Sequence, residues 1–402
     1  MPKYLFFLIL TGLIIFLPTI TIGFTFDDIA QIVNNKYVHH KENLPMFLKS
    51  GIAAPGEKNG FFTFFYRPFP FMLYTLLYDY GKGNPLNFHV VQLFFFLLNT
   101  CLVFILFSKF FSSRLSFILS LIFLVHPISQ TLATYIADYF DTFSFFFGML
   151  ALIIIISKKI TIWPKAILSC ILLFFSLLSK ESGALFIPLI CFYGKLFHYL
   201  KMKIYSFSLL FVVILYALLR NNAYHNHFLT YLSSYPLEQP FLNRILMIPT
   251  LLFYYYKEIF APALSEPGVK EITQNPPPLL IILGTHLLLI IGTVAYTLFL
   301  KKHHPKFLKI FLFFLCCFFL GIILYVQILP LDMLIERRWL SLALVGALGM
   351  LGVAVTTFPI RSKRFIFIFR ILIALYILAL TSATIKLNLD LKEWWLHIAP
   401  QP

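Results

Sequence analysis

Apolar runs long enough to cross a lipid bilayer recur along this 402-residue chain. A helix needs about 20 apolar residues to span the hydrocarbon core, and by that measure the chain has about eleven such runs. They lie at residues 4–22, 88–108, 115–132, 139–157, 164–179, 182–200, 204–219, 278–300, 307–327, 338–358 and 365–385. Only 12% of the residues are charged, against about 25% in a soluble domain. The sequence therefore predicts an all-α polytopic membrane protein.

The charged residues between the runs indicate how the chain crosses the membrane. Short connections that are basic and free of acids carry Lys109, Arg114, Lys158, Lys159, Lys165, Lys195, Lys201, Lys203, Lys301, Lys302, Lys306, Arg361, Lys363 and Arg364. The positive-inside rule places such connections in the cytoplasm. All 16 acidic residues fall in or beside the segments on the opposite side. We expect an outer face specialised for polar chemistry. The net charge of +16 is explained by basic residues that set the topology and face anionic lipid headgroups, so it does not indicate binding of nucleic acid.

Two of the predicted outer connections are long, at residues 23–87 and 220–277. Within them, 61–80 and 244–262 are apolar but carry arginine or lysine and several prolines. We predict that both segments form helices that lie at the membrane interface without crossing it.

The first apolar run follows Lys3 and has no small-residue cleavage site after it, which indicates an uncleaved anchor. The 5 cysteines lie inside apolar runs without metal-ligand spacing and are predicted to be small buried hydrophobes. We expect one transmembrane domain over residues 1–385 and a short outer-side tail at 386–402, which is too small to fold alone.

Two adjacent aspartates, Asp27 and Asp28, follow the first apolar run. A carboxylate in hydrocarbon costs about 2.5–3.5 kcal/mol, so acids near a membrane lie where water or chemistry needs them. Repulsion between neighbouring carboxylates separates their pKa values and leaves one of them as a potential proton acceptor. Paired aspartates also end helices at an aqueous boundary, so a structural and a catalytic role both stay open on the pair alone.

Other polar residues on the predicted outer side are sparse. Those that are candidates for a role in the site are Arg67, His89, His126, Asp138, Lys180, Glu181, Arg244, Arg337 and Arg338. Each has a structural alternative: arginines snorkel at span ends, Lys180 and Glu181 form a local ion pair, and the histidines are hydrogen-bonded in the core. Asp138 either caps its helix or lines the site.

Several short motifs occur along the chain in the order that is typical of one protein family. They are Asp27-Asp28, Tyr66-Arg67-Pro68, Phe88-His89, His126-Pro127, Ala137-Asp138, Leu178-Ser179-Lys180-Glu181, Arg244 with a tyrosine-rich segment, and Glu336-Arg337 with Gly346. This pattern resembles the C-type (GT-C) integral-membrane glycosyltransferases, and in particular the membrane part of the transmembrane-and-TPR O-mannosyltransferases and their bacterial relatives. These 402 residues include no TPR repeats, and they have Trp339-Leu340 where a Tyr-Leu pair is usual.

The resemblance implies transfer of a sugar from a polyprenyl- or dolichyl-phosphate donor to a hydroxyl at the outer face, with inversion. A phosphate leaving group is a stable anion, so the reaction needs only a base for the incoming hydroxyl. Asp27 is the expected base, and Asp28 orients it or holds the acceptor. Arginine binds phosphate bidentately, so Arg337 is the expected donor contact, supported by Arg338 and Lys180. Supporting roles are expected for Arg67, His89, His126, Asp138, Glu181 and Arg244.

Alternative functions share parts of this pattern. A lipid-linked glycan flippase or transporter is the main non-catalytic alternative, although its coupling charges would lie near the bilayer midplane. A surface-glycan polymerase or ligase would use the same kind of donor. The expected partners are the lipid-phosphate sugar, a protein, lipid or glycan acceptor, and membrane lipids. Asp27, Asp28 and Asp138 could offer oxygens to a divalent metal, which is not assigned. The expected location is a bacterial inner membrane, with the site on the periplasmic side.

Overall fold

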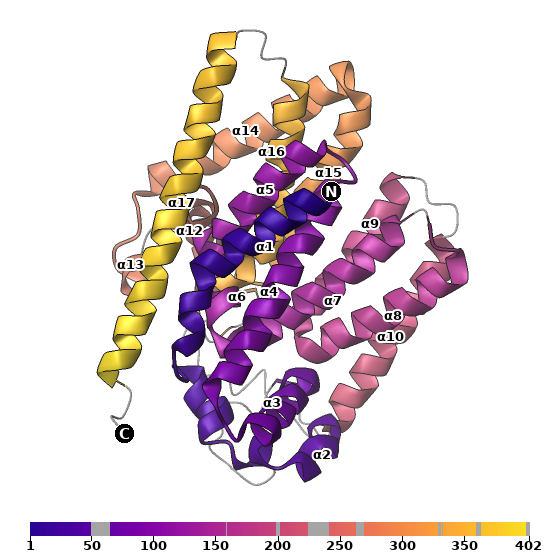
Figure 1. Ribbon diagram of the computed structural model, residues 1–402. Coiled ribbons are helices and arrows are strands. Elements are labelled where there is room, and N and C mark those ends of the chain that lie inside the picture. The colour runs from indigo at the N-terminus through magenta and orange to yellow at the C-terminus, as the bar shows by residue number, and fades with distance from the viewer. Residues whose placement is uncertain are drawn as a thin grey trace. The chain divides into compact units, whose positions relative to one another are not determined.

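The computed structural model describes residues 1–49, 65–157, 159–197, 202–223, 241–262, 269–328, 331, 333–358 and 363–398 (Figure 1). Within these ranges, eight helices are long and apolar enough to cross a membrane, or nine if one bent pair counts as a single span. All secondary-structure elements of the described residues are helical. The predicted class, an all-α polytopic membrane protein, is confirmed.

The α-helices occur along the chain in the following order. They are α1 (Pro2–Phe16), α2 (Leu44–Lys49), α3 (Pro68–Gly81), α4 (Pro85–Phe107), α5 (Ser113–Val125), α6 (Pro127–Thr134), α7 (Tyr139–Ile156), α8 (Ile162–Ser179), α9 (Phe186–Leu196), α10 (Met202–Ala223), α12 (Phe241–Phe260), α13 (Val269–Thr273), α14 (Leu279–His303), α15 (Pro305–Ile323), α16 (Ser341–Thr357) and α17 (Lys363–Ile398). Short helical turns occupy η1 (Leu17–Thr21), η2 (Ile29–Val33), η3 (Lys36–His39), η4 (Lys41–Asn43), η5 (Ile136–Asp138), η6 (Glu181–Leu185) and η7 (Arg337–Leu340).

Each of the eleven predicted apolar runs overlaps at least one helix, but within the described residues only eight or nine candidate spans result. The run at 115–132 divides into α5 and α6, which are bent by 66° at His126, because Pro127 starts a new helix. Helix α9 has only 11 residues. Neither α3 nor α12 qualifies as a span, in agreement with the prediction that these segments do not cross the membrane.

Some residues used in the sequence argument lie outside the described ranges. They are 61–64, Glu57, Lys158, Lys201, Glu238, Glu266, Pro330, Asp332, Arg361 and 399–402. Helix α17 continues through residue 386 to Ile398 without a break. The division into a domain at 1–385 and a separate tail stays a prediction.

The chain forms two compact units. Unit 1 consists of Met1, Phe104–Gln130 and Pro236–Leu387. Unit 2 consists of Pro2–Val103, Thr131–Tyr235 and Asn388–Pro402.

Unit 2 has an aromatic core between α3, α4 and α7, in which Tyr74 and Tyr139 are fully buried. The Tyr74 hydroxyl donates to the carbonyl of Ile136 at 2.9 Å, and the Tyr139 hydroxyl donates to the carbonyl of Phe88 at 2.6 Å. A buried tyrosine hydroxyl needs such a partner. These bonds attach the turn η5 firmly to the core.

Polar side chains of α4 also hold the segment around η5 in unit 2. The Gln92 amide nitrogen donates to the Leu132 carbonyl at 2.8 Å, to the Tyr135 carbonyl at 3.2 Å and to the Thr142 hydroxyl at 3.0 Å. The Asn99 amide donates to the Thr142 carbonyl at 2.9 Å. The start of α7 is therefore fixed by hydrogen bonds as well as by packing.

In unit 1, α15 and α16 pack so closely that glycine is required between them. A Cβ added at Gly346 would lie 2.7 Å from the backbone oxygen of Phe314 and 2.7 Å from the Cα of Phe318. Small residues allow this kind of backbone approach between membrane helices.

We expect Gly346→Ala to lower the thermal unfolding midpoint, because the new methyl group forces α15 and α16 apart. Gly292→Ala is the matched control, since nothing lies within 4 Å of a Cβ at that position in α14, and alanine is favoured over glycine in a helix by about 1 kcal/mol. The control should unfold at the same or a higher temperature. Equal effects of the two substitutions would contradict the close packing.

Candidate active site

The predicted base, Asp27, lies in a tight turn that ends the first long helical segment of unit 2. The backbone N–H of Asp28 donates to the Thr25 carbonyl at 2.8 Å. Asp28 Oδ2 in turn accepts from the Thr25 backbone N–H at 2.9 Å and from its hydroxyl at 3.3 Å. Phe26, inside the turn, has a φ of +45°, which is rare for a residue with a β-carbon. The turn leads directly into η2, a short π-helix.

Two hydrogen bonds tie this turn to η5. Asp28 Oδ1 accepts from the Ala137 backbone N–H at 2.7 Å. The Asp27 backbone N–H donates to the Tyr135 hydroxyl at 2.9 Å. The structure thus holds the Asp27-Asp28 turn against residues 135–137, which directly precede Asp138 and lie more than 100 residues away in the sequence.

The two neighbouring aspartates differ in environment. Asp28 is fully buried, whereas Asp27 is partly exposed. Burial raises the pKa of Asp28 to about 8, opposed by the hydrogen bonds from Thr25 and Ala137 and assisted by the charge of Asp27. Both Asp28 oxygens accept hydrogen bonds from the backbone, so this carboxyl holds the turn in place. Asp27 is the member of the pair that solvent or substrate can reach.

The raised pKa of Asp28 predicts a pH-dependent stability. Its pKa is about 8 in the folded protein and 3.8 in the unfolded chain, so the folded state binds an extra proton between these values. Because folding is linked to proton binding, the contribution of Asp28 to the free energy of unfolding falls as pH rises from about 4 to 8. Above pH 8 this contribution levels off. The difference in unfolding midpoint between the parent and Asp28→Asn, measured from pH 5 to 9, should follow this curve. Identical pH profiles for the two proteins would refute the buried, protonated carboxyl.

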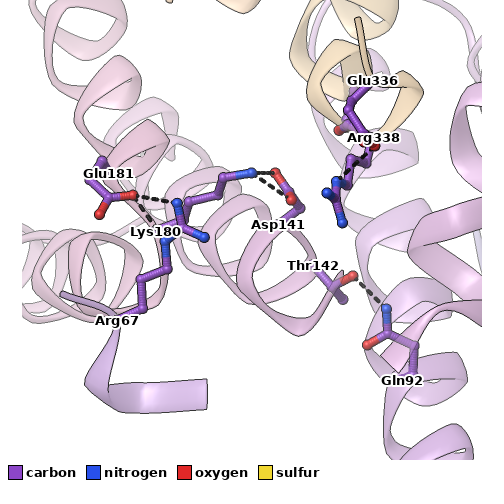
Figure 2. A network of polar contacts seen from close by, with 9 residues as sticks. Arg67, Gln92, Asp141, Thr142, Lys180, Glu181, Glu336 and Arg338 are labelled. Carbon is purple, nitrogen blue, oxygen red and sulfur yellow. Dashed lines mark hydrogen bonds and ion pairs between the residues drawn. The ribbon is translucent and has the colours of Figure 1, made fainter. Parts of the chain in front are cut away.

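Two ion pairs of unit 2 hold the segment after α8 (Figure 2). Lys180 Nζ lies 2.7 Å from each carboxylate oxygen of Asp141, and both side chains are nearly buried. Arg67 donates to Glu181 Oε2 through Nε at 3.0 Å and Nη2 at 2.9 Å. Lys180 and Glu181, which the sequence suggested as a local pair, are thus each bound by a different distant residue.

Burial acts to raise the pKa of Glu181, but the charges of Arg67 and Arg220 outweigh burial and hold the pKa below its usual value. Glu181 is therefore ionised. The guanidinium of Arg67 also lies over the ring of Phe65, 4.1 Å from its centroid. Arg67 precedes α3, so this pair fixes the point where α3 begins.

Sequence reasoning did not select Asp141 as a site residue. Asp141 lies in the first turn of α7, three residues after Asp138, which directly precedes this helix. This separation of three residues was the sequence feature that could have identified Asp141 as a site residue. Asp141 neutralises the one lysine that was predicted to contact the donor.

In unit 1, Arg337 is held by an acid that sequence reasoning left out of the site. Arg337 Nε donates to Glu258 Oε2 at 2.7 Å, and both side chains are buried. Glu258 belongs to α12 and Arg337 to η7. Arg338 Nε lies 3.1 Å from Glu336 Oε2, and Figure 2 shows this pair beside the backbone of η7.

The two predicted histidines are both buried. In unit 1, His126 Nδ1 accepts from the Ile128 N–H at 3.2 Å, and its Nε2 contacts the Ile259 carbonyl at 3.1 Å. Both nitrogens of His126 are therefore used by the backbone, which is a structural role. In unit 2, His89 lies beside the backbone of Ile22 and Gly23, without a hydrogen bond of good geometry within the described part of the chain.

Arg244, in α12 of unit 1, differs from the other predicted cations. Its Nε and Nη1 atoms are buried without a hydrogen-bond partner among the described residues, and its guanidinium lies 5.6 Å from the centroid of the Phe241 ring. Unit 1 thus holds Arg244, Arg337, Arg338 and His126, and unit 2 holds the remaining predicted site residues.

Across the described ranges, no three His, Cys, Asp or Glu side chains form a group that could hold a metal ion, and we assign none.

These features define an all-α polytopic membrane protein with buried ion pairs and an acidic turn outside its spans. Within that class, the chain is similar to protein O-mannosyl-transferase TMTC3 of Homo sapiens, with 25% identity over 175 residues, which are 42% of this chain and 19% of the relative. The Mus musculus protein of the same name is 24% identical over 175 residues, again 42% of this chain and 19% of the relative.

Protein O-mannosyl-transferase F38B6.6 of Caenorhabditis elegans is 30% identical over 192 residues, which are 46% of this chain and 27% of the relative. The similarity thus covers less than half of this chain and at most about a quarter of these relatives. No protein-family model and no solved structure matches the chain.

Proposed function

We propose that this protein is a membrane glycosyltransferase that moves a hexose from a polyprenyl- or dolichyl-phosphate donor to a hydroxyl acceptor. Its similarity to proteins named O-mannosyl-transferases supports the reaction class and favours mannose and a protein acceptor. The observation that carries the proposal is the position of Asp27, a partly exposed acid in a turn that hydrogen bonds hold against the segment before Asp138, outside the candidate spans.

In the proposed reaction, Asp27 accepts the proton of the acceptor hydroxyl. The hydroxyl oxygen then bonds to the anomeric carbon as the bond from that carbon to the phosphate oxygen breaks. The lipid phosphate leaves as an anion and needs no acid, and the single displacement inverts the anomeric carbon. Asp28 is a positioning residue in this scheme, because both of its oxygens bind the backbone. General base catalysis of this kind contributes about 10²–10⁴-fold to a rate.

The donor phosphate needs cations, and Arg337 remains our first choice. Glu258 binds the Nε of Arg337 and so fixes the plane of the guanidinium, which favours bidentate recognition of phosphate oxygens. Arg338 and Lys180 are the proposed supporting cations, although each already binds a carboxylate. Arg244 joins this set because two of its nitrogens lack partners in the described structure.

We place the site on the outer side of a bacterial inner membrane, because the basic connections occupy the other side of the predicted topology. The proposal is tested by giving the purified protein polyprenyl-phosphate mannose, polyprenyl-phosphate glucose or GDP-mannose, each with a serine- and threonine-containing peptide. We expect glycosylated peptide and an equal amount of released polyprenyl phosphate with a lipid-linked donor only. Movement of the donor across vesicle membranes without transfer would instead indicate a flippase.

A further inference from the structure

The last turns of α17 bring two tryptophans to the aspartate turn within unit 2. Trp394 stacks on Phe26, with ring centroids 4.0 Å apart and planes inclined by 21°. Trp395 packs against Gly23, where an added Cβ would meet the indole ring. The Asn388 side chain donates to the Ile15 carbonyl at 3.2 Å and so holds this end of α17 against the end of α1.

Phe26 occupies an unusual conformation for a bulky residue. Its positive φ of +45° is strained for any residue with a β-carbon, and such strain persists where the surrounding structure imposes it. Burial of the ring does not offset the strain, since 53% of Phe26 remains exposed. The turn thus holds an aromatic ring at the surface, one residue before Asp27.

A third aromatic ring, that of Tyr135, lies next to Phe26 and to the backbone of Asp27. The Tyr135 ring meets Phe26 edge-on, with centroids 6.0 Å apart, and the Tyr135 hydroxyl accepts the Asp27 N–H. Asp27 therefore directly follows an exposed aromatic residue, Phe26, and its backbone N–H is bound by the hydroxyl of a second one, Tyr135. A ligand that fits this arrangement needs an apolar face and a hydroxyl group on the same small ring.

A hexose ring has both properties. Its axial C–H groups form an apolar face, and these weakly positive hydrogens are attracted by the negative face of an aromatic ring. We propose that the stacked pair of Phe26 and Trp394 offers an outer ring face to the hexose of the donor, which places its anomeric carbon within reach of a hydroxyl bound at Asp27. This proposal rests on the proposed glycosyltransferase function and assigns the sugar subsite to the end of α17.

Interfacial tryptophans also anchor proteins to lipid headgroups, so the test separates sugar from lipid. The probes are a short-chain prenyl-phosphate mannose and the same prenyl phosphate without the sugar. We expect Trp394→Ala to weaken binding of the mannose-bearing probe, and to raise the donor KM, by about threefold to tenfold. Binding of the sugar-free probe should not change, and Trp394→Phe, which keeps a ring, should restore most of the affinity.

Trp163, which is 63% exposed at the start of α8, supplies the matched control, and Trp163→Ala should leave both affinities unchanged. Phe26→Leu keeps an apolar side chain without a ring and is the second variant if Trp394→Ala does not fold. If Trp394→Ala weakened the binding of both probes equally, or of neither, the proposed sugar-binding role of Phe26 and Trp394 would be overturned. If the parent protein transfers sugar while KM is insensitive to both variants, the subsite fails and the glycosyltransferase stands; if the parent neither binds nor transfers, the proposed function itself fails.

Discussion

Asp27→Asn is expected to lower kcat/KM for sugar transfer by about 10²–10⁴-fold, the usual contribution of a general base. The amide has the shape of the carboxylate but cannot take a proton from the acceptor. The Asp27 backbone bond to Tyr135 is unaffected by this change, so the turn keeps its geometry. Single-turnover transfer from a polyprenyl-phosphate sugar measures the effect, and donor affinity should stay within about twofold of the parent value.

Glu42→Gln is the matched control, because Glu42 is an exposed acid of the same predicted outer connection. It removes the same charge without touching the aspartate turn and should transfer sugar at the parent rate. Asp28→Asn should retain more activity than Asp27→Asn, since Asp28 acts only by holding the turn. Transfer by Asp27→Asn at the parent rate would show that another group is the base.

Glu258→Leu is expected to destabilise the protein by about 3–5 kcal/mol, because it removes a buried carboxylate from the guanidinium of Arg337. The Arg337–Glu258 pair is 2.7 Å long, with Glu258 fully buried and Arg337 nearly so. The double variant Glu258→Leu with Arg337→Met removes both charges and should recover most of the lost stability. Unfolding in denaturant, followed in detergent micelles, measures the differences.

A second ion pair of unit 1 provides the comparison for this experiment. Lys257 and Glu271 lie 3.7 Å apart and are both substantially exposed, so Glu271→Gln should cost at most about 1 kcal/mol. The double variant at 258 and 337 should fold and still fail to transfer sugar, because it lacks the proposed phosphate contact. Full transfer activity in that variant would remove Arg337 from the donor site.

The helices were predictable because a bilayer imposes a length and a composition on each span. Runs such as 278–300 and 139–157 stand out by hydropathy alone, and the prolines and charges within 244–262 indicated a segment that does not qualify as a span, as is found for α12. The break between α5 and α6 was missed, although Pro127 was visible, because the run at 115–132 was judged by its overall hydropathy.

Partners of the charged residues were not predictable, because they depend on how distant helices pack. Lys180 and Asp141 are 39 residues apart, Arg337 and Glu258 are 79 apart, and Arg67 and Glu181 are 114 apart. Sequence reasoning could examine only near neighbours, such as Lys180 with Glu181. The contact of Asp28 with the segment before Asp138 was anticipated only in part, through the order of motifs in a resembling family.

The amides of Gln92 and Asn99 have a consequence for biogenesis. Their partners belong to the segment from Leu132 to Thr142, which leaves the ribosome about 40 residues later. Lipid offers no replacement for these hydrogen bonds, and each unmet polar group in hydrocarbon costs several kcal/mol. Helix α4 should therefore stay beside the insertion machinery until α7 arrives, so that the two helices enter the bilayer as a pair.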